Sequence, residues 1–148
     1  MKISTKGRYG VAAMYDLALH YGAGPQALKS VAERQDISES YLEQLISALR
    51  KGGYVKSVRG AQGGYALSKN PKDISVGDII RLLEGPIAPV DCVLTDVSSS
   101  KNEYCSKAGR CVTRGVWAKV RDSITNVVDS ITLADLCRDE KFEEMDKK

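Results

Sequence analysis

The sequence lacks the patterns that mark membrane proteins, secreted proteins and most enzymes. No run of about eighteen apolar residues occurs in its 148 residues, which excludes an ordinary transmembrane helix. The first residues, MKISTK, have neither the apolar stretch nor the cleavage site of a secretory signal. There is no C-x-x-C pair, no phosphate-binding glycine loop and no acid–base grouping that supports catalysis. We therefore expect a cytoplasmic protein that does not cross a membrane and is not an enzyme.

Positive charge is unevenly spread, although the formal net charge is only +3. Residues 1–70 contain ten lysines and arginines against five aspartates and glutamates, whereas residues 71–148 contain twelve against fourteen. A basic first half and a nearly neutral second half are typical of a nucleic-acid-binding region joined to an assembly region. The signal is weak by itself, because many enzymes carry basic patches of that size.

Apolar spacing in the first half predicts a helix-turn-helix followed by a hairpin. Helical periodicity runs from residue 8 to 21 and again over 27–32, and a strongly amphipathic helix extends to residue 50. Ser38 or Ser40 can cap this third helix, and Ser40 with Glu43 fits a capping box. Residues 54–67 place β-branched and aromatic residues on both sides of a glycine-rich turn, as in a hairpin. Together these elements predict a winged helix, with a further helix over 74–83.

The second half predicts a long helix suited to pairing with another copy of the chain. Five apolar residues follow heptad spacing there, and little predicted core lies nearby to cover them. We therefore expect a homodimer in which this seam packs against the partner chain. Thr132 with Asp135 fits the cap of a last short helix. The seam residues are Trp117, Val120, Ile124, Val127 and Ile131.

The expected fold is mainly α with a small β wing: a winged helix-turn-helix domain plus a long C-terminal dimerisation helix. We expect the winged-helix DNA-binding domain over residues 1–83 and a cysteine-bearing loop over 84–111. The dimerisation helix and a short final helix then occupy 112–137. Residues 138–148 are rich in charge, so we expect a disordered tail.

Three polar sets are candidates for DNA contacts. On the third helix, Gln44 suits adenine, Glu43 suits a cytosine amino group, and Ser40 suits a base or a phosphate. A glycine-rich hairpin tip lets Arg59 enter the minor groove and lets the backbone approach a phosphate. A solvated helix face and a tight turn are the plainer alternatives. The complete set is Ser38, Ser40, Tyr41, Glu43, Gln44, Arg59, Gly60 and Gln62, with Thr5, Lys6 and Arg8 as phosphate contacts.

Three of the four cysteines lie within twenty residues, in a segment without periodicity. Cys92, Cys105 and Cys111 form a C-x12-C-x5-C pattern, which is too widely spaced for a typical zinc site. Cytosolic thiols stay reduced, so the pattern favours metal binding or redox sensing over structural disulfides. Thiolates on a loop suit an iron–sulfur cluster, which normally takes four protein ligands. Three unrelated cysteines are the alternative explanation.

Four motifs give the chain a resemblance to a known family. They are KGRY at 6–9, SYLEQL at 40–45, RGAQGGY at 59–65 and GDII at 77–80. The set resembles the IscR, NsrR and CymR family of winged-helix transcription regulators over roughly residues 1–136. The resemblance implies a homodimer that binds a pseudo-palindromic operator in double-stranded DNA and controls iron–sulfur biogenesis or sulfur metabolism genes. It also implies an iron–sulfur cluster, 2Fe–2S in preference to 4Fe–4S, on Cys92, Cys105 and Cys111.

The chain departs from the cluster-binding members of that family at two points. The interval between the first two cysteines is longer, and Arg114 stands where those members have a histidine. Arginine stays protonated and is not a ligand, so the fourth ligand is open. We hypothesise that the resulting lability of the cluster is the sensing event. The segment EGPI at 84–87 resembles CymR, so the alternative is a cluster-free regulator controlled by thiol oxidation or by a partner enzyme.

Overall fold

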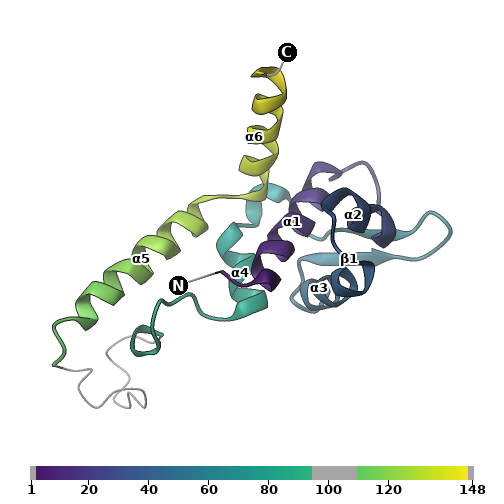
Figure 1. Cartoon of the computed structure of the whole chain (residues 1–148). Coiled ribbons are helices and arrows are strands. Elements are labelled where there is room, and N and C mark those ends of the chain that lie inside the picture. Colours follow the sequence, from purple (N-terminus) through teal and green to yellow (C-terminus); the bar gives the residue numbers. More distant parts are fainter. Residues whose placement is uncertain (1–2, 95–109, 147–148) are drawn as a thin grey trace.

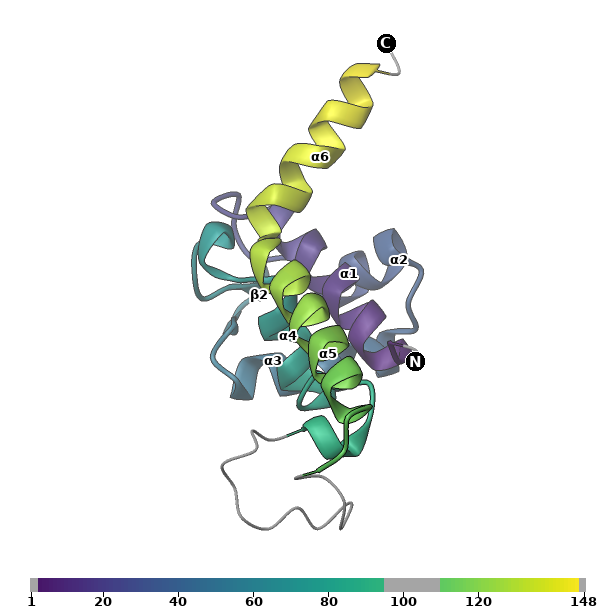
Figure 2. The same ribbon diagram turned by 90° about the vertical axis from the view of Figure 1, so that its left-hand side faces the viewer.

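The computed structural model describes the backbone of residues 3–94 and 110–146, with side chains as far as residue 139. A head built from α1 to α4 carries a hairpin at one side, α5 runs along its opposite side, and α6 projects away from it (Figure 1; Figure 2). The expected fold, mainly helical with a small two-stranded wing, is confirmed. The helices and strands are α1 Thr5–Leu19, α2 Leu28–Gln35, α3 Glu39–Lys51, β1 Val55–Val58, β2 Gly64–Leu67, α4 Val76–Glu84, α5 Arg114–Ser130 and α6 Leu133–Asp146, with the short 3-10 helices η1 Pro71–Asp73 and η2 Asp91–Val93.

Helices α1, α3 and α4 enclose the apolar core of the head. The apolar stripe that the sequence predicts for α3 is buried, and its Leu42 and Leu49 are 0% exposed. Met14 of α1 is equally inaccessible. Helices α1 and α4 approach so closely that a β-carbon at Gly10 would lie 2.1 Å from Cδ1 of Leu83. Burial of each large apolar side chain contributes roughly 1.5–3 kcal/mol to folding, so this core holds the helices of the head together.

The start of α3 differs from the expected capping box. Ser38 is the N-cap, and its hydroxyl oxygen accepts a hydrogen bond from the Tyr41 backbone N–H at 3.3 Å. Ser40 lies inside the first turn of the helix. The predicted box of Ser40 with Glu43 is therefore wrong, because a capping box needs its serine outside the helical turn.

Helix α4 begins two residues later than expected, because the residues before it pair with the chain that follows α5. Leu133 N–H donates to the Ile74 carbonyl at 3.0 Å, and Val76 N–H donates to the Ile131 carbonyl at 2.8 Å. A reciprocal capping box at Ser75 then starts the helix. The junction between α5 and α6 is thus joined by backbone hydrogen bonds to the start of α4.

The last helix is longer than the sequence indicated. Thr132 and Asp135 form the expected cap: Thr132 N–H donates to Oδ2 of Asp135 at 2.9 Å, and Asp135 N–H donates to Oγ1 of Thr132 at 3.1 Å. The backbone then stays helical through residues 138–146, where we expected a disordered tail. Glu, Lys, Arg, Leu and Met are strong helix formers, which favours continuation of a helix that is already capped and packed.

An ion pair joins α4 of the head to α5. Arg81 Nη2 lies 2.6 Å from Oδ1 of Asp129 and 3.4 Å from Oδ1 of Asp78. The pKa of Arg81 is raised, chiefly by its hydrogen bond to Asp129. A β-carbon at Gly77 would lie 1.9 Å from the same Asp129 oxygen, so a larger residue here would have to displace that carboxylate. The glycine of the GDII motif thus has a packing role.

Replacement of Gly77 by Ala should push the Asp129 carboxylate away from Arg81. We expect Gly77→Ala to lower the free energy of unfolding by about 1 kcal/mol, because both the contact and the local packing are lost. The matched control is Gly115→Ala in α5, where an added β-carbon meets nothing within 4 Å. It should raise stability by up to about 1 kcal/mol through helix propensity. Urea denaturation measures both, and equal stability of the two variants would contradict the contact.

Candidate DNA interface and cysteine segment

Helix α3 presents a polar outer face. Ser40, Glu43 and Gln44 are all exposed on it, as the sequence predicts. Tyr41 is half-buried, and its ring meets that of Tyr9 edge-to-face, with centroids 5.9 Å apart and planes at 79°. Such aromatic pairs prefer this arrangement, so Tyr41 braces α3 against α1.

The turn between α2 and α3 sets the direction of α3. Asp36 adopts φ 52° in the left-handed region, which aspartate tolerates better than most residues. Ile37 N–H donates to the Ala32 carbonyl at 3.0 Å and closes α2, while the Ile37 side chain enters the core at 7% exposure. The exposed Ser38 follows as the cap, so its oxygen is already engaged and its hydroxyl hydrogen is left to donate.

The basic start of α1 lies beside α3. Thr5, Lys6 and Arg8 are exposed on its first turns. The guanidinium carbon of Arg8 lies 6.0 Å from the ring centroid of Tyr9, the residue that contacts Tyr41. The expected phosphate contacts are therefore brought next to the face expected to meet bases.

The hairpin carries the third expected set at its tip. Val55 pairs with Leu67 at its base, and both are 2% exposed in the core. Arg59, Gly60 and Gln62 are exposed in the turn. Gly60 has φ +118°, a conformation that other residues rarely adopt. Figure 1 shows the hairpin extending beyond the helices on the side away from α5.

Backbone hydrogen bonds attach the wing to the segment between α1 and α2. Gln26 N–H donates to the Tyr65 carbonyl and Tyr65 N–H donates to the Gln26 carbonyl, both at 2.8 Å. A β-carbon at Gly64 would lie 2.2 Å from the Gln26 carbonyl oxygen. Glycine at this position therefore allows the attachment.

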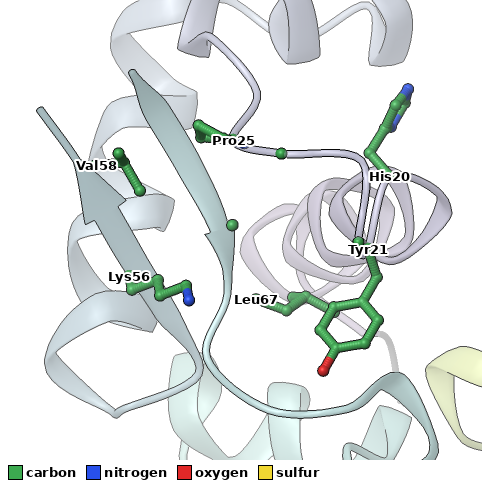
Figure 3. Close-up of a pocket in the computed structure, with 9 residues that line it drawn as sticks. His20, Tyr21, Pro25, Lys56, Val58 and Leu67 are labelled. Carbon is green, nitrogen blue, oxygen red and sulfur yellow. The ribbon is translucent and has the colours of Figure 1, made fainter. Parts of the chain in front are cut away.

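A cavity of about 380 Å³ lies between the hairpin and the end of α1 (Figure 3). Lys56 and Val58 of β1 line one side, and His20 and Tyr21 line the other. Nδ1 of His20 lies 2.8 Å from the Asp16 carbonyl, so this ring nitrogen already has a partner. Part of β1 thus borders the cavity. The wing is attached to the head at its buried base and through the backbone of Gln26.

The structure describes two of the three predicted cysteine ligands, and they lie in different segments. Cys92 lies in η2 and Cys111 lies just before α5, and both are half-buried. Cys105 lies outside the described residues. The Cys111 sulfur is 3.1 Å from Oγ1 of Thr113. Among the described residues, no group of three or more His, Cys, Asp or Glu side chains is placed to hold a metal ion.

Arg114 joins these two cysteine-bearing segments. Its Nε donates to the carbonyl of Cys92 at 2.9 Å, and its side chain is buried at 8% exposure. Arg114 starts α5 three residues after Cys111, so the contact brings the beginning of that helix to Cys92. The sequence excluded Arg114 as a ligand but did not indicate this structural role.

Comparison with known proteins identifies the family. A family model described as an iron-dependent transcriptional regulator, Rrf2, matches residues 3–139. CymR, an HTH-type transcriptional regulator of Bacillus subtilis, is 52% identical over 92% of this chain and 89% of its own length. The chain belongs to the Rrf2 family of transcriptional regulators.

Solved structures agree with this Rrf2 assignment and with the resemblance to IscR and CymR. IscR of T. potens superposes with a TM-score of 0.76 at 56% identity, covering 95% of this chain and 88% of that one. CymR of B. subtilis, described as its global cysteine regulator, superposes with a TM-score of 0.75 at 48% identity, covering 93% and 97%. Within residues 3–94 and 110–146 of the Rrf2 chain, no helix has the length and apolar composition needed to cross a bilayer.

A buried charge, which no motif in the sequence marks, orients the Rrf2 head. The Asp16 carboxylate is 1% exposed and accepts hydrogen bonds from Arg34 Nε and Nη2 at 2.9 and 2.8 Å and from Gln35 Nε2 at 3.2 Å. Arg34 also donates to Oε1 of Gln26 at 3.1 Å, and its pKa is raised chiefly by the hydrogen bond to Asp16. The sequence signal that could have revealed this buried charge is one carboxylate, directly before Leu17, in an otherwise apolar stretch of α1.

Removal of the Asp16 charge should loosen α2 without changing the shape of the core. We expect Asp16→Asn to lower the free energy of unfolding by about 2 to 3 kcal/mol, because a charge-assisted bidentate pair is replaced by weaker hydrogen bonds. Urea denaturation measures the change, and Glu33→Gln at an exposed position of α2 is the matched control. A loss no larger than that of Glu33→Gln would refute the organising role of Asp16.

Proposed function

We propose that this Rrf2 protein is a homodimeric transcription regulator whose affinity for a pseudo-palindromic operator depends on iron–sulfur or redox status at its cysteines. Iron–sulfur biogenesis or sulfur metabolism genes are the proposed targets. The observation that carries the DNA-binding part is the exposed polar face of α3, with a basic helix start beside it and an arginine-tipped wing on the same head.

The contacts proposed for α3 follow from the side chains on its outer face. Gln44 pairs with adenine, Glu43 accepts from a cytosine amino group, and Ser40 bonds a base or a phosphate. Ser38 donates its hydroxyl hydrogen to a phosphate, because its oxygen already caps the helix. Tyr41 acts by holding the helix against α1.

The wing and α1 supply the remaining proposed DNA contacts. Arg59 enters the minor groove, where the narrow groove concentrates negative potential. Gly60 and Gln62 bring the backbone of the turn to the phosphate rail. A third set, made of Thr5, Lys6 and Arg8 at the exposed start of α1, contacts phosphates and sets the register.

The proposed homodimer seam lies on α5. Val116, Trp117 and Val127 are 52%, 41% and 58% exposed, which leaves large apolar side chains in water on one helix. Val120 and Ile124 between them are half-buried. An apolar stripe with heptad spacing is what a second copy of the same helix covers. Two heads joined through this seam would match two operator half-sites.

The proposed cofactor is an iron–sulfur cluster, 2Fe–2S in preference to 4Fe–4S, with Cys92, Cys105 and Cys111 as ligands. Thiolates are the donors that such clusters take, and Cys92 and Cys111 are half-buried in the two segments that Arg114 joins. The guanidinium of Arg114 supplies positive charge there, which offsets the charge of a thiolate-bound cluster. When bound, the cluster supplies a metal–sulfur centre open to oxygen, nitric oxide or small thiols.

The second candidate function is a cluster-free regulator of cysteine metabolism controlled by thiol oxidation or by a partner enzyme. It is favoured by the 52% identity to CymR of B. subtilis over nearly the whole chain. Both candidates use the same DNA-binding head and the same thiols. They differ in whether iron binds.

Truncation of the wing arginine tests the DNA contact. Arg59→Ala should weaken binding to an operator selected from a random DNA library by the parent protein, and should reduce the slope of log K against log salt by about one unit. The matched control is Lys72→Ala, an exposed cation of η1, which packs near α6. Gel shifts over a salt series supply the measurement. An unchanged slope would remove Arg59 from the interface.

Anaerobic reconstitution with iron and sulfide distinguishes the two candidates. We expect cluster absorbance in the parent chain and its loss in Cys92→Ala, because each thiolate is a ligand that the site cannot replace. Cys137→Ala, in α6, is the matched control and should keep the absorbance. A colourless parent whose operator affinity responds to oxidant alone would establish the cluster-free regulator instead.

A further inference from the structure

Two arginines of α5 hold the turn that carries Cys92. In a single-turn 3-10 helix such as η2, the last carbonyl groups rely on donors from outside the helix. Arg114 Nε donates to the Cys92 carbonyl at 2.9 Å, and Arg121 Nη1 donates to the Val93 carbonyl at 2.8 Å. The two arginines are seven residues apart, so they lie on one face of α5, about two turns from each other.

The contact is enclosed. Arg114 is 8% exposed, Val93 is 0% exposed, and the Arg121 side chain is 21% exposed. A guanidinium keeps its charge at all working pH values, so one that is removed from water must retain its acceptors. Any shift of the Cys92 backbone therefore has to be followed by the first two turns of α5 or else break these hydrogen bonds.

The opposite end of α5 is attached to a different part of the molecule. Asp129 forms its ion pair with Arg81 of α4, and Ile131 beyond the helix accepts from the backbone of Val76. Figure 1 and Figure 2 show η2 beside the beginning of α5 and α4 nearer its end. A displacement at the Cys92 end, with the Asp129 end held, tilts α5 relative to the head.

We propose that Arg114 and Arg121 are positioning residues that transmit the state of the Cys92 thiol to the dimerisation helix. The inference rests on the proposed function in taking Cys92 as a sensing thiol. A ligand or adduct on the Cys92 sulfur displaces η2 and loosens the two arginine contacts. The packing of α5, and with it the separation of the two DNA-binding heads, then changes.

The test uses the full chain with Cys92 as its single thiol, obtained by Cys105→Ser, Cys111→Ser and Cys137→Ser. Iodoacetamide alkylates it: the Cys92 thiolate displaces iodide and forms a thioether. Hydrogen exchange of backbone amides in peptides covering residues 114–124 is followed by mass spectrometry before and after alkylation. Neither DNA nor metal is present, so the result is independent of whether the protein binds a cluster or an operator.

Alkylation should speed exchange in the first two turns of α5 about tenfold, the effect of losing charge-assisted hydrogen bonds. With Arg121→Gln, exchange should start faster and alkylation should add no more than about threefold, because one of the two connections is already absent. Arg114→Gln combined with Arg121→Gln should abolish the response. Lys119→Gln, an exposed cation between the two arginines, is the matched control and should respond as fully as the single-thiol parent.

Two results would overturn the proposal. One is unchanged exchange of α5 after complete alkylation of the single-thiol parent. The other is an Arg121→Gln response equal to that of Lys119→Gln. The partly exposed Arg121 keeps the test usable even where replacement of the buried Arg114 prevents folding. Thermal melting of each variant distinguishes a loss of coupling from general unfolding. A variant that has only lost the coupling melts, before alkylation, near the midpoint of the control.

Discussion

The buried carboxylate of Asp16 is the constraint on which the DNA-binding head depends. A charge at 1% exposure has to be matched, and Arg34 matches it with two parallel hydrogen bonds whose geometry admits one orientation of α2. Arg34 also reaches Gln26, whose backbone pairs with Tyr65 of the wing. One charge thus orients α1, α2 and the wing together. The apolar core brings these elements into contact but does not specify their direction so sharply.

Arg114 has the corresponding role at the other end of the molecule. In the part of the chain that the structure describes, Asp16 and Arg114 are the charged residues that are buried. Arg114 directs its guanidinium to the backbone of Cys92, and between the two ends Arg81 joins the head to Asp129 of α5. Head, long helix and cysteine segment are therefore connected in series by directional polar contacts. This series is the physical basis of the proposed link between thiol chemistry and the affinity for DNA.

Much of the fold could be predicted because its signals are local. The stripe on α3, the glycine turn at Gly60 and the cap formed by Thr132 and Asp135 each depend on residues within a few positions of one another. The capping box at Ser40 failed for a related reason. Ser38 lies two residues earlier and offers the same hydroxyl chemistry, so the pattern alone does not choose between them.

The sequence by itself determined the order and kind of the elements, the family, and the polar sets that are candidates for DNA contacts. Only the tertiary structure decided that Asp16 meets Arg34, that Arg81 meets Asp129, and that Arg114 serves the Cys92 backbone. These pairs join residues 18, 48 and 22 positions apart. Periodicity shows which face of a helix is apolar, whereas the partner of a charged side chain is set by how whole helices pack, and no local pattern encodes that choice.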